Sequence, residues 1–159
     1  MPDLLVKLYE LPELEPLRRS LAEQGFTLRR GIPPERHIVL DWIQKHFNNH
    51  WADEAAVAFA NKPSTIVLVV DENTKGVAGF ACYEATYKAF FGPIGVHPDY
   101  RGKEIGRALT LAALHGLAEL GYAYGIIGGA GPVEFYRKTV EVLEIPGSAP
   151  GIYRGMLRS

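Results

Sequence analysis

The sequence predicts an α/β (α+β) fold in which helices flank one mixed central sheet. Three observations support this prediction. A β-rich segment at 90–96 leads through a basic loop into a helical apolar pattern that runs from about Glu104 to Gly121. A further strand at 122–127 follows this helix and is therefore expected to lie parallel to the first. Before them, β-rich segments at 64–70 and 77–87 flank a turn and predict an antiparallel hairpin.

Length and composition favour one domain over residues 1–159, because 159 residues with 47% hydrophobic composition can bury about two-thirds of their unfolded surface. The net charge of −1 predicts neither nucleic-acid nor anionic-membrane partners. No stretch approaches the ~20 apolar residues of a membrane span. The single cysteine and the lack of a recognisable signal peptide favour a cytoplasmic location. The oligomeric state stays open, a homodimer being one possibility.

The first 25 residues are predicted to form a strand and a helix that extend the domain at its N-terminus. Apolar residues alternate from Leu4 to Leu8, which favours a short strand. Leucines then recur at helical spacing until Gly25, a typical helix stop. A second strand is predicted at 26–30, and the role of residues 1–25 is not assigned.

Two helices are predicted next, at about 35–47 and 52–60, with Ile38, Trp42 and Phe47 on the buried side of the first. His46 and His50 are four residues apart, as in half of a metal site. No third ligand is evident, so a solvated helix end is favoured and no metal is predicted. Cys82, within the second hairpin strand, is interpreted as a small core residue because no activating partner is placed near it.

The strand at 90–96 contains Gly92, Pro93 and Gly95. Proline removes one donor from a sheet ladder and glycine permits a bulge. This strand is therefore expected to bend and to open a gap beside its neighbour.

The segment from Arg101 to Arg107 combines two glycines with three basic residues at the start of a helix. The first amide N–H groups of a helix lack intrahelical partners and carry partial positive charge, so they favour an anion such as phosphate. An ordinary turn with solvated basic residues is the alternative. Neither GxxxxGK[ST] nor GxGxxG is present, which argues against the loops that bind nucleoside triphosphates or dinucleotides.

Residues 101–106 resemble the [Q/R]-x-x-G-x-[G/A] loop of the GNAT N-acetyltransferase superfamily, which follows a strand often ending in Val-x-Pro, here Val96-His97-Pro98. Glu104 departs from the pattern, since the family usually has a glycine there. The resemblance implies a sheet splayed between the strands at 90–96 and 122–127, with coenzyme A held in the gap. The residues that it implies for acetyl-CoA binding are Ile94, Val96, Arg101, Gly102, Lys103, Glu104, Ile105, Gly106 and Arg107.

A second point of resemblance is Phe135-Tyr136 on a short helix after the glycine-rich segment 128–131. The family commonly has an aromatic-tyrosine pair there, and its tyrosine protonates the departing thiolate. This implies a catalytic role for Tyr136, with a half-buried packing tyrosine as the alternative. Gly129 replaces the frequent asparagine seven residues earlier. Strands are predicted at 140–145 and 151–157.

The function predicted from the resemblance is direct transfer of an acetyl group from acetyl-CoA to a primary amine of a small molecule or peptide. The alternative is a noncatalytic acyl-CoA-binding or regulatory module. The general base is not identified, because Phe90 stands where some members have a glutamate; Glu84, His97 and Glu134 are weak candidates. An acceptor pocket could draw on aromatic residues that are otherwise expected in the core: Trp42, Trp51, Phe59, Tyr83, Tyr87 and Phe91.

Overall fold

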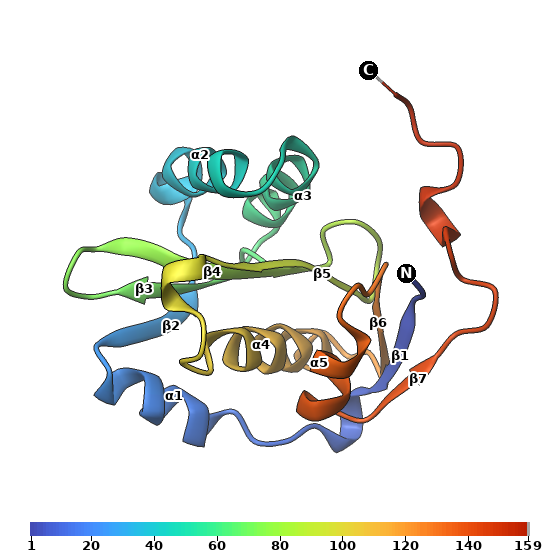
Figure 1. The fold of residues 1–159 in the computed structure, drawn as a ribbon, viewed down its shortest axis with the longest axis horizontal. Coiled ribbons are helices and arrows are strands. Elements are labelled where there is room, and N and C mark those ends of the chain that lie inside the picture. Colours follow the sequence, from blue (N-terminus) through green and yellow to red (C-terminus); the bar gives the residue numbers. More distant parts are fainter. Residues whose placement is uncertain (159) are drawn as a thin grey trace.

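A computed structural model describes residues 1–158 and shows one seven-stranded sheet with helices on both faces (Figure 1). The strands, in chain order, are β1 (Leu4–Lys7), β2 (Phe26–Arg30), β3 (Ile66–Asp71), β4 (Gly76–Tyr83), β5 (Phe90–Val96), β6 (Tyr124–Ile127) and β7 (Val142–Glu144). The α-helices are α1 (Glu15–Glu23), α2 (Arg36–His46), α3 (Asn49–Ala60), α4 (Ile105–Glu119) and α5 (Val133–Thr139). The predicted mixed α/β architecture is confirmed.

The helices divide the core into two layers. Helices α2 and α3 cover one face of the sheet, while α4, α1 and α5 lie on the other (Figure 1). Val39, Ile43 and Phe59 pack against Phe80 on the first face. On the second face α4 is apolar on almost every side and buries nine residues, as expected of a helix enclosed between a sheet and another helix. This is the helix whose N-terminus forms the predicted anion site.

The sheet is splayed where the sequence predicts it. Strands β2 to β5 pair in sequence order and antiparallel, which confirms the hairpin. Strands β5 and β6 are parallel but pair only at Phe90 with Ile126 and at Phe91 with Ile127. From Gly92 onward β5 continues beside β4 alone, because Pro93 offers no N–H to a neighbour and the β4–β5 register shifts between Ala81 and Tyr83. We call the point where β5 and β6 separate, at Phe91 and Ile127, the fork.

The N-terminal strand lies inside the sheet, a position that the sequence does not assign. Strand β1 lies between β6 and β7 and is antiparallel to both. Helix α1 packs against β2 and α4. Residues 1–25 therefore supply an internal strand and a covering helix to the domain, because Leu4 and Val6 can bury their side chains only inside the sheet.

Two other sequence predictions are wrong. The strand predicted at 151–157 is a single 3-10 turn at Gly151–Tyr153, where Gly151 has a φ of 61° that a strand cannot accommodate. Ile38, predicted to be buried, is 56% exposed, and α2 buries Val39 and Ile43 instead. Trp42 and Phe47 pack against the core as predicted, and only Ile38 does not, because this helix carries apolar residues on more than one side.

No helix among residues 1–158 combines the length and the apolar composition needed to cross a membrane.

Candidate active site

The segment before α4 presents a row of amide groups with no acceptor in the protein. The N–H groups of the six residues 102–107 donate no hydrogen bond within residues 1–158, whereas the next, Ala108 N–H, donates to Glu104 O at 3.1 Å. Three of these groups belong to the first turn of α4 and point along its axis. Such a concentration of free donors at a helix N-terminus favours a bound anion.

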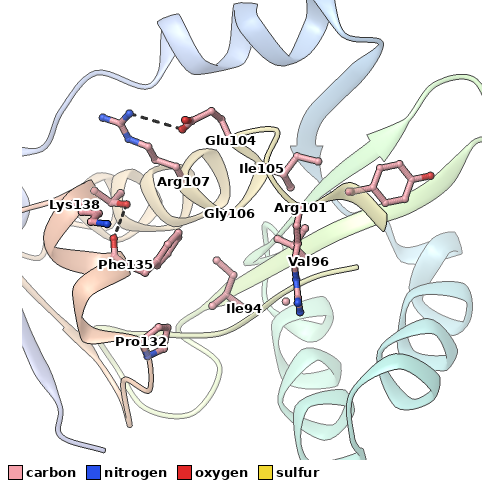
Figure 2. Close-up of a pocket in the computed structure, with 14 residues that line it drawn as sticks. Ile94, Val96, Arg101, Glu104, Ile105, Gly106, Arg107, Pro132, Phe135 and Lys138 are labelled. Atoms are coloured by element: carbon pink, nitrogen blue, oxygen red, sulfur yellow. Dashed lines mark hydrogen bonds and ion pairs between the residues drawn. The ribbon is translucent and has the colours of Figure 1, made fainter. Parts of the chain in front are cut away.

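A cavity of about 740 Å³ opens in front of these amides, between β5, the first turn of α4, and α5 (Figure 2). Every residue predicted to bind coenzyme A lines it except Lys103, whose side chain is exposed to solvent outside the cavity. The sequence prediction missed part of the wall, since Phe135, Lys138 and Thr139 line it from α5. Their helical spacing, one turn apart on the helix that carries Tyr136, is a signal that could have identified them.

The edge of β5 that faces this cavity has unpaired backbone groups. His97 N–H donates to Ala78 O of the segment that forms β4, at 3.0 Å. Because the hydrogen-bonding direction alternates along a strand, the backbone groups of Val96 and Ile94 point away from β4. Strand β6 has separated by then and cannot pair with them. An extended ligand with amide groups can bind there as an added strand.

Three basic side chains line the cavity, and one of them, Arg107, forms an ion pair with Glu104. Arg101 and Lys138 line the cavity without a carboxylate partner among residues 1–158. Arg107 Nη1 lies 3.8 Å from Glu104 Oε2, and Figure 2 shows this pair at the entrance to α4. Both side chains are largely exposed, so the pair contributes at most about 1 kcal/mol.

The model of the acetyltransferase (GNAT) family matches residues 36–138, which is more than half of the chain. The chain belongs to the GNAT acetyltransferase family. A search of curated proteins found no match. The family assignment agrees with the splayed sheet and with the free amides at the head of α4.

Solved structures share the fold at low sequence identity. A GCN5-related glucosamine N-acetyltransferase region of a fungal multi-domain β-N-acetylglucosaminidase has a TM-score of 0.71 at 14% identity, over 90% of this chain and 20% of that one. A GNAT protein of Sphaerobacter thermophilus has a TM-score of 0.67 at 15% identity, over 90% and 48% of the two chains. A Brucella melitensis GNAT acetyltransferase in complex with acetyl-CoA has a TM-score of 0.56 at 17% identity, over 76% and 88%. This chain thus spans half or less of the first two.

Glu104, the departure from the GNAT loop pattern, adopts a left-handed backbone conformation with φ 68° and ψ 13°. This conformation costs a residue with a Cβ about 1–2 kcal/mol relative to its right-handed alternatives, whereas glycine adopts it freely. The structure thus supplies a physical reason for the glycine that the family pattern has at this position. It also shows that glutamate is tolerated, with its side chain turned toward Arg107.

We expect Glu104→Gly to retain the fold and to bind acetyl-CoA about two- to fivefold more tightly, because a carboxylate leaves the cavity rim and Arg107 becomes free to meet phosphate. Calorimetry measures the affinity. Glu104→Gln is the matched control, since it removes the charge but keeps the strained backbone. Weaker binding by Glu104→Gly would show that the glutamate supports the loop.

Tyr136 does not line the cavity but lies behind it. The residue is 4% exposed, and its ring packs edge-on against Phe91 at the fork, with centroids 5.9 Å apart. Burial raises the pKa of Tyr136 to about 12, so the hydroxyl stays protonated at neutral pH. The structure therefore places the Tyr136 ring at the point where β5 and β6 separate, and the catalytic role of its hydroxyl stays a prediction.

The three weak candidates for a base are engaged elsewhere. Glu84 accepts hydrogen bonds from Ala89 N–H and the Tyr122 hydroxyl. Glu134 is exposed and pairs with Arg137. The ring of His97 accepts from Asp99 N–H and contacts His46 beyond the end of β5. Glu84 lies beside the fork, since its N–H donates to Phe90 O at 2.9 Å, but both of its carboxylate oxygens already accept hydrogen bonds.

Cys82 and most of the aromatic residues considered for an acceptor pocket have structural roles. Cys82 is fully buried, and burial raises the pKa of its thiol well above the ordinary value, which supports the interpretation as a core residue. No group of three or more metal-ligating side chains occurs within the described part of the chain. Of the aromatic residues considered for an acceptor pocket, Phe59, Tyr83 and Phe91 belong to the core, Trp42 and Trp51 pack against it, and Tyr87 is 56% exposed.

Proposed function

We propose that this protein is an acetyl-CoA-dependent N-acetyltransferase that transfers the acetyl group directly to a primary amine. One observation carries the proposal: the free amides of residues 104–107 and the unpaired edge of β5 open into the same cavity. The free amides suit a diphosphate, and the unpaired edge of β5 suits the amide-containing arm of coenzyme A. Together they match one ligand with both groups, which is the expected cosubstrate of a GNAT protein.

The geometry assigns a separate task to each part of the site. The amides at the head of α4, with Arg101, hold the diphosphate. Ile94 and Val96 guide the arm along β5 toward the fork, so that the thioester arrives near Phe91 and Tyr136. There an amide N–H of the splayed part of β5 can stabilise the developing oxyanion, and the Tyr136 hydroxyl can donate to the departing thiolate.

Direct transfer is favoured over an acetylated enzyme intermediate. Cys82 is buried, and its raised pKa keeps the thiol protonated and unreactive. No other cysteine exists in the sequence. The amine therefore attacks the thioester itself, and the protein positions the two reactants.

The second candidate function is a noncatalytic coenzyme A-binding or regulatory module. It is favoured by Phe90 at the position where some family members have a glutamate. A cytoplasmic location and a small-molecule or peptide acceptor stay predictions under either function. Turnover distinguishes the two, because both bind coenzyme A and only the enzyme releases free thiol in the presence of an amine.

Acetyl-CoA at one hundred times its dissociation constant should stabilise the protein by about 2.7 kcal/mol. For a domain of this size this corresponds to a rise in melting temperature of about 5–10 °C. Thermal melting with and without the ligand measures the effect, and Arg101→Ala should reduce it. A melting curve that acetyl-CoA leaves unchanged would rule out both candidate functions.

A further inference from the structure

The acceptor must reach the fork from the face opposite the coenzyme A cavity. The cavity, α4 and α5 occupy one face, and Phe91 and Tyr136 fill the space behind them. The other face is covered by α2 and α3 only in part, and in Figure 1 the loop between β4 and β5 rises beside α3 on this side. Groups that α3 and this loop present near the fork are therefore placed to meet an acceptor.

Glu54 of α3 is the carboxylate that these elements bring there. The hydroxyl of Thr86, in the loop that leads into β5, donates a hydrogen bond to Glu54 Oε2. Glu54 also lies near Cys82, since it contributes, after burial, to raising the pKa of that thiol. The register pairs Ala81 with Ile94 and Tyr83 with Phe91, so Cys82 stands opposite the first splayed residues of β5. Glu54 thus faces the sheet where the strands begin to separate.

The carboxylate of Glu54 is free to bind a cation. It forms no ion pair with any lysine, arginine or histidine of residues 1–158, and only Oε2 accepts a hydrogen bond from the protein. The neighbouring Asp3 is engaged by Gly129 N–H at 2.8 Å, and Lys88 of the same loop is exposed to solvent. A half-buried carboxylate with a free oxygen suits an ammonium group.

Aromatic side chains stand beside Glu54 on the same face. Phe90 packs against Tyr87, with ring centroids 5.6 Å apart, and Tyr87 is 56% exposed. Tyr153 of the C-terminal turn, 38% exposed, lies near Thr86, and burial, with a smaller contribution from Glu54, raises its pKa. A Cβ on Gly128 would come within 3.0 Å of Phe90, so glycine at this position leaves room for the Phe90 ring. Such surroundings suit an apolar or aromatic group near the amine.

We propose that Glu54 binds the acceptor and acts as its general base, and that the acceptor is a primary alkylammonium carried on an aromatic or apolar group. This inference rests on the proposed function. One proton passes from R–NH₃⁺ to Glu54, and the free amine attacks the thioester carbon. The C–N bond forms, the C–S bond breaks, the Tyr136 hydroxyl protonates the departing thiolate, and the second amine proton restores that hydroxyl. Glu54 then releases its proton to water, so that the products are the acetamide, coenzyme A and one H⁺.

A comparison of two amines tests the inference. Phenethylamine is cationic at pH 7 and must lose a proton before it attacks, whereas 4-methoxyaniline is already neutral. Glu54→Gln should lower kcat/KM for phenethylamine about 100-fold or more, the range expected for loss of a general base, and should leave the arylamine almost unaffected. Asp53→Asn is the matched control, because Asp53 is exposed on the same helix and both amines should react normally with this variant.

Glu54→Ala provides a second variant, in which added formate should partly restore turnover of phenethylamine. Equal losses for the two amines would indicate a structural role and overturn the inference, as would no loss at all. A wild-type protein that binds coenzyme A but acetylates neither amine, or only the arylamine, also overturns it. Failure of acetyl-CoA to stabilise the wild-type protein is a separate result, which contradicts the proposed function itself.

Discussion

Tyr136→Phe is expected to lower kcat about 100-fold or more while acetyl-CoA affinity and the melting temperature stay nearly unchanged. The ring, which packs against Phe91 and Phe135, is retained in the variant. Among residues 1–158 no fully buried side-chain polar atom lacks a hydrogen-bond partner, so the Tyr136 hydroxyl, which bonds no other residue, retains access to solvent and its removal leaves no partner without a bond. A loss of activity would therefore reflect the missing proton donor and not a rearranged core.

The measurement is release of free thiol at saturating acetyl-CoA, with phenethylamine as acceptor. Tyr100→Phe is the matched control, because it removes the hydroxyl of another tyrosine, one that donates to Asp71 far from the fork. Since burial raises the pKa of Tyr136 to about 12, its hydroxyl stays protonated throughout the pH range of the assay. Wild-type turnover should accordingly show no loss from tyrosine ionisation between pH 7 and 10. Equal rates for Tyr136→Phe and wild type would remove the role of Tyr136 as an acid.

The elements that the sequence predicts correctly are those with local signals. Helix α4 follows from a long apolar period between Glu104 and Gly121, and the hairpin from two β-rich segments around a turn. The splay also has a local cause. Gly92, Pro93 and Gly95 interrupt β5 whichever strands lie beside it. The loop predicted to bind coenzyme A is likewise continuous in the chain, so the sequence can name the residues that line the cavity there, apart from Lys103, which does not line it.

Features that depend on distant contacts were not predicted. The wall that α5 adds to the cavity requires knowing how α5 docks on α4. Glu54 carries no motif, and it becomes a candidate only because the β4–β5 loop returns beside α3 and places Thr86 against it. Phe135 lines the cavity and Tyr136 is buried, although the sequence assigns Tyr136 to the active site. This arrangement follows from the packing of α5 and not from the spacing of residues along the helix.

The sequence predicts β1 as a strand but not its position in the sheet, and that position has a measurable consequence. A strand that joins β6 on one side and β7 on the other closes a gap in the sheet, although the segment precedes β6 by more than a hundred residues along the chain. Alternating apolar residues predict a strand but do not identify its neighbours. An N-terminal extension would tolerate a charge, whereas an internal strand would not.

Val6→Asp is therefore expected to destabilise the domain by about 4 kcal/mol or more, which few single substitutions reach. Val6 is fully buried and pairs with Gly125 of β6 and with Val142 of β7, so the carboxylate would be enclosed without a partner. With a slope of about 2 kcal/mol per molar urea, the unfolding midpoint should fall by about 2 M. Lys7→Gln, on the half-exposed side of the same strand, should shift it little, because the ion pairs of Lys7 with Glu10 and Glu141 are exposed. An unchanged midpoint for Val6→Asp would mean that β1 does not hold the sheet together in solution.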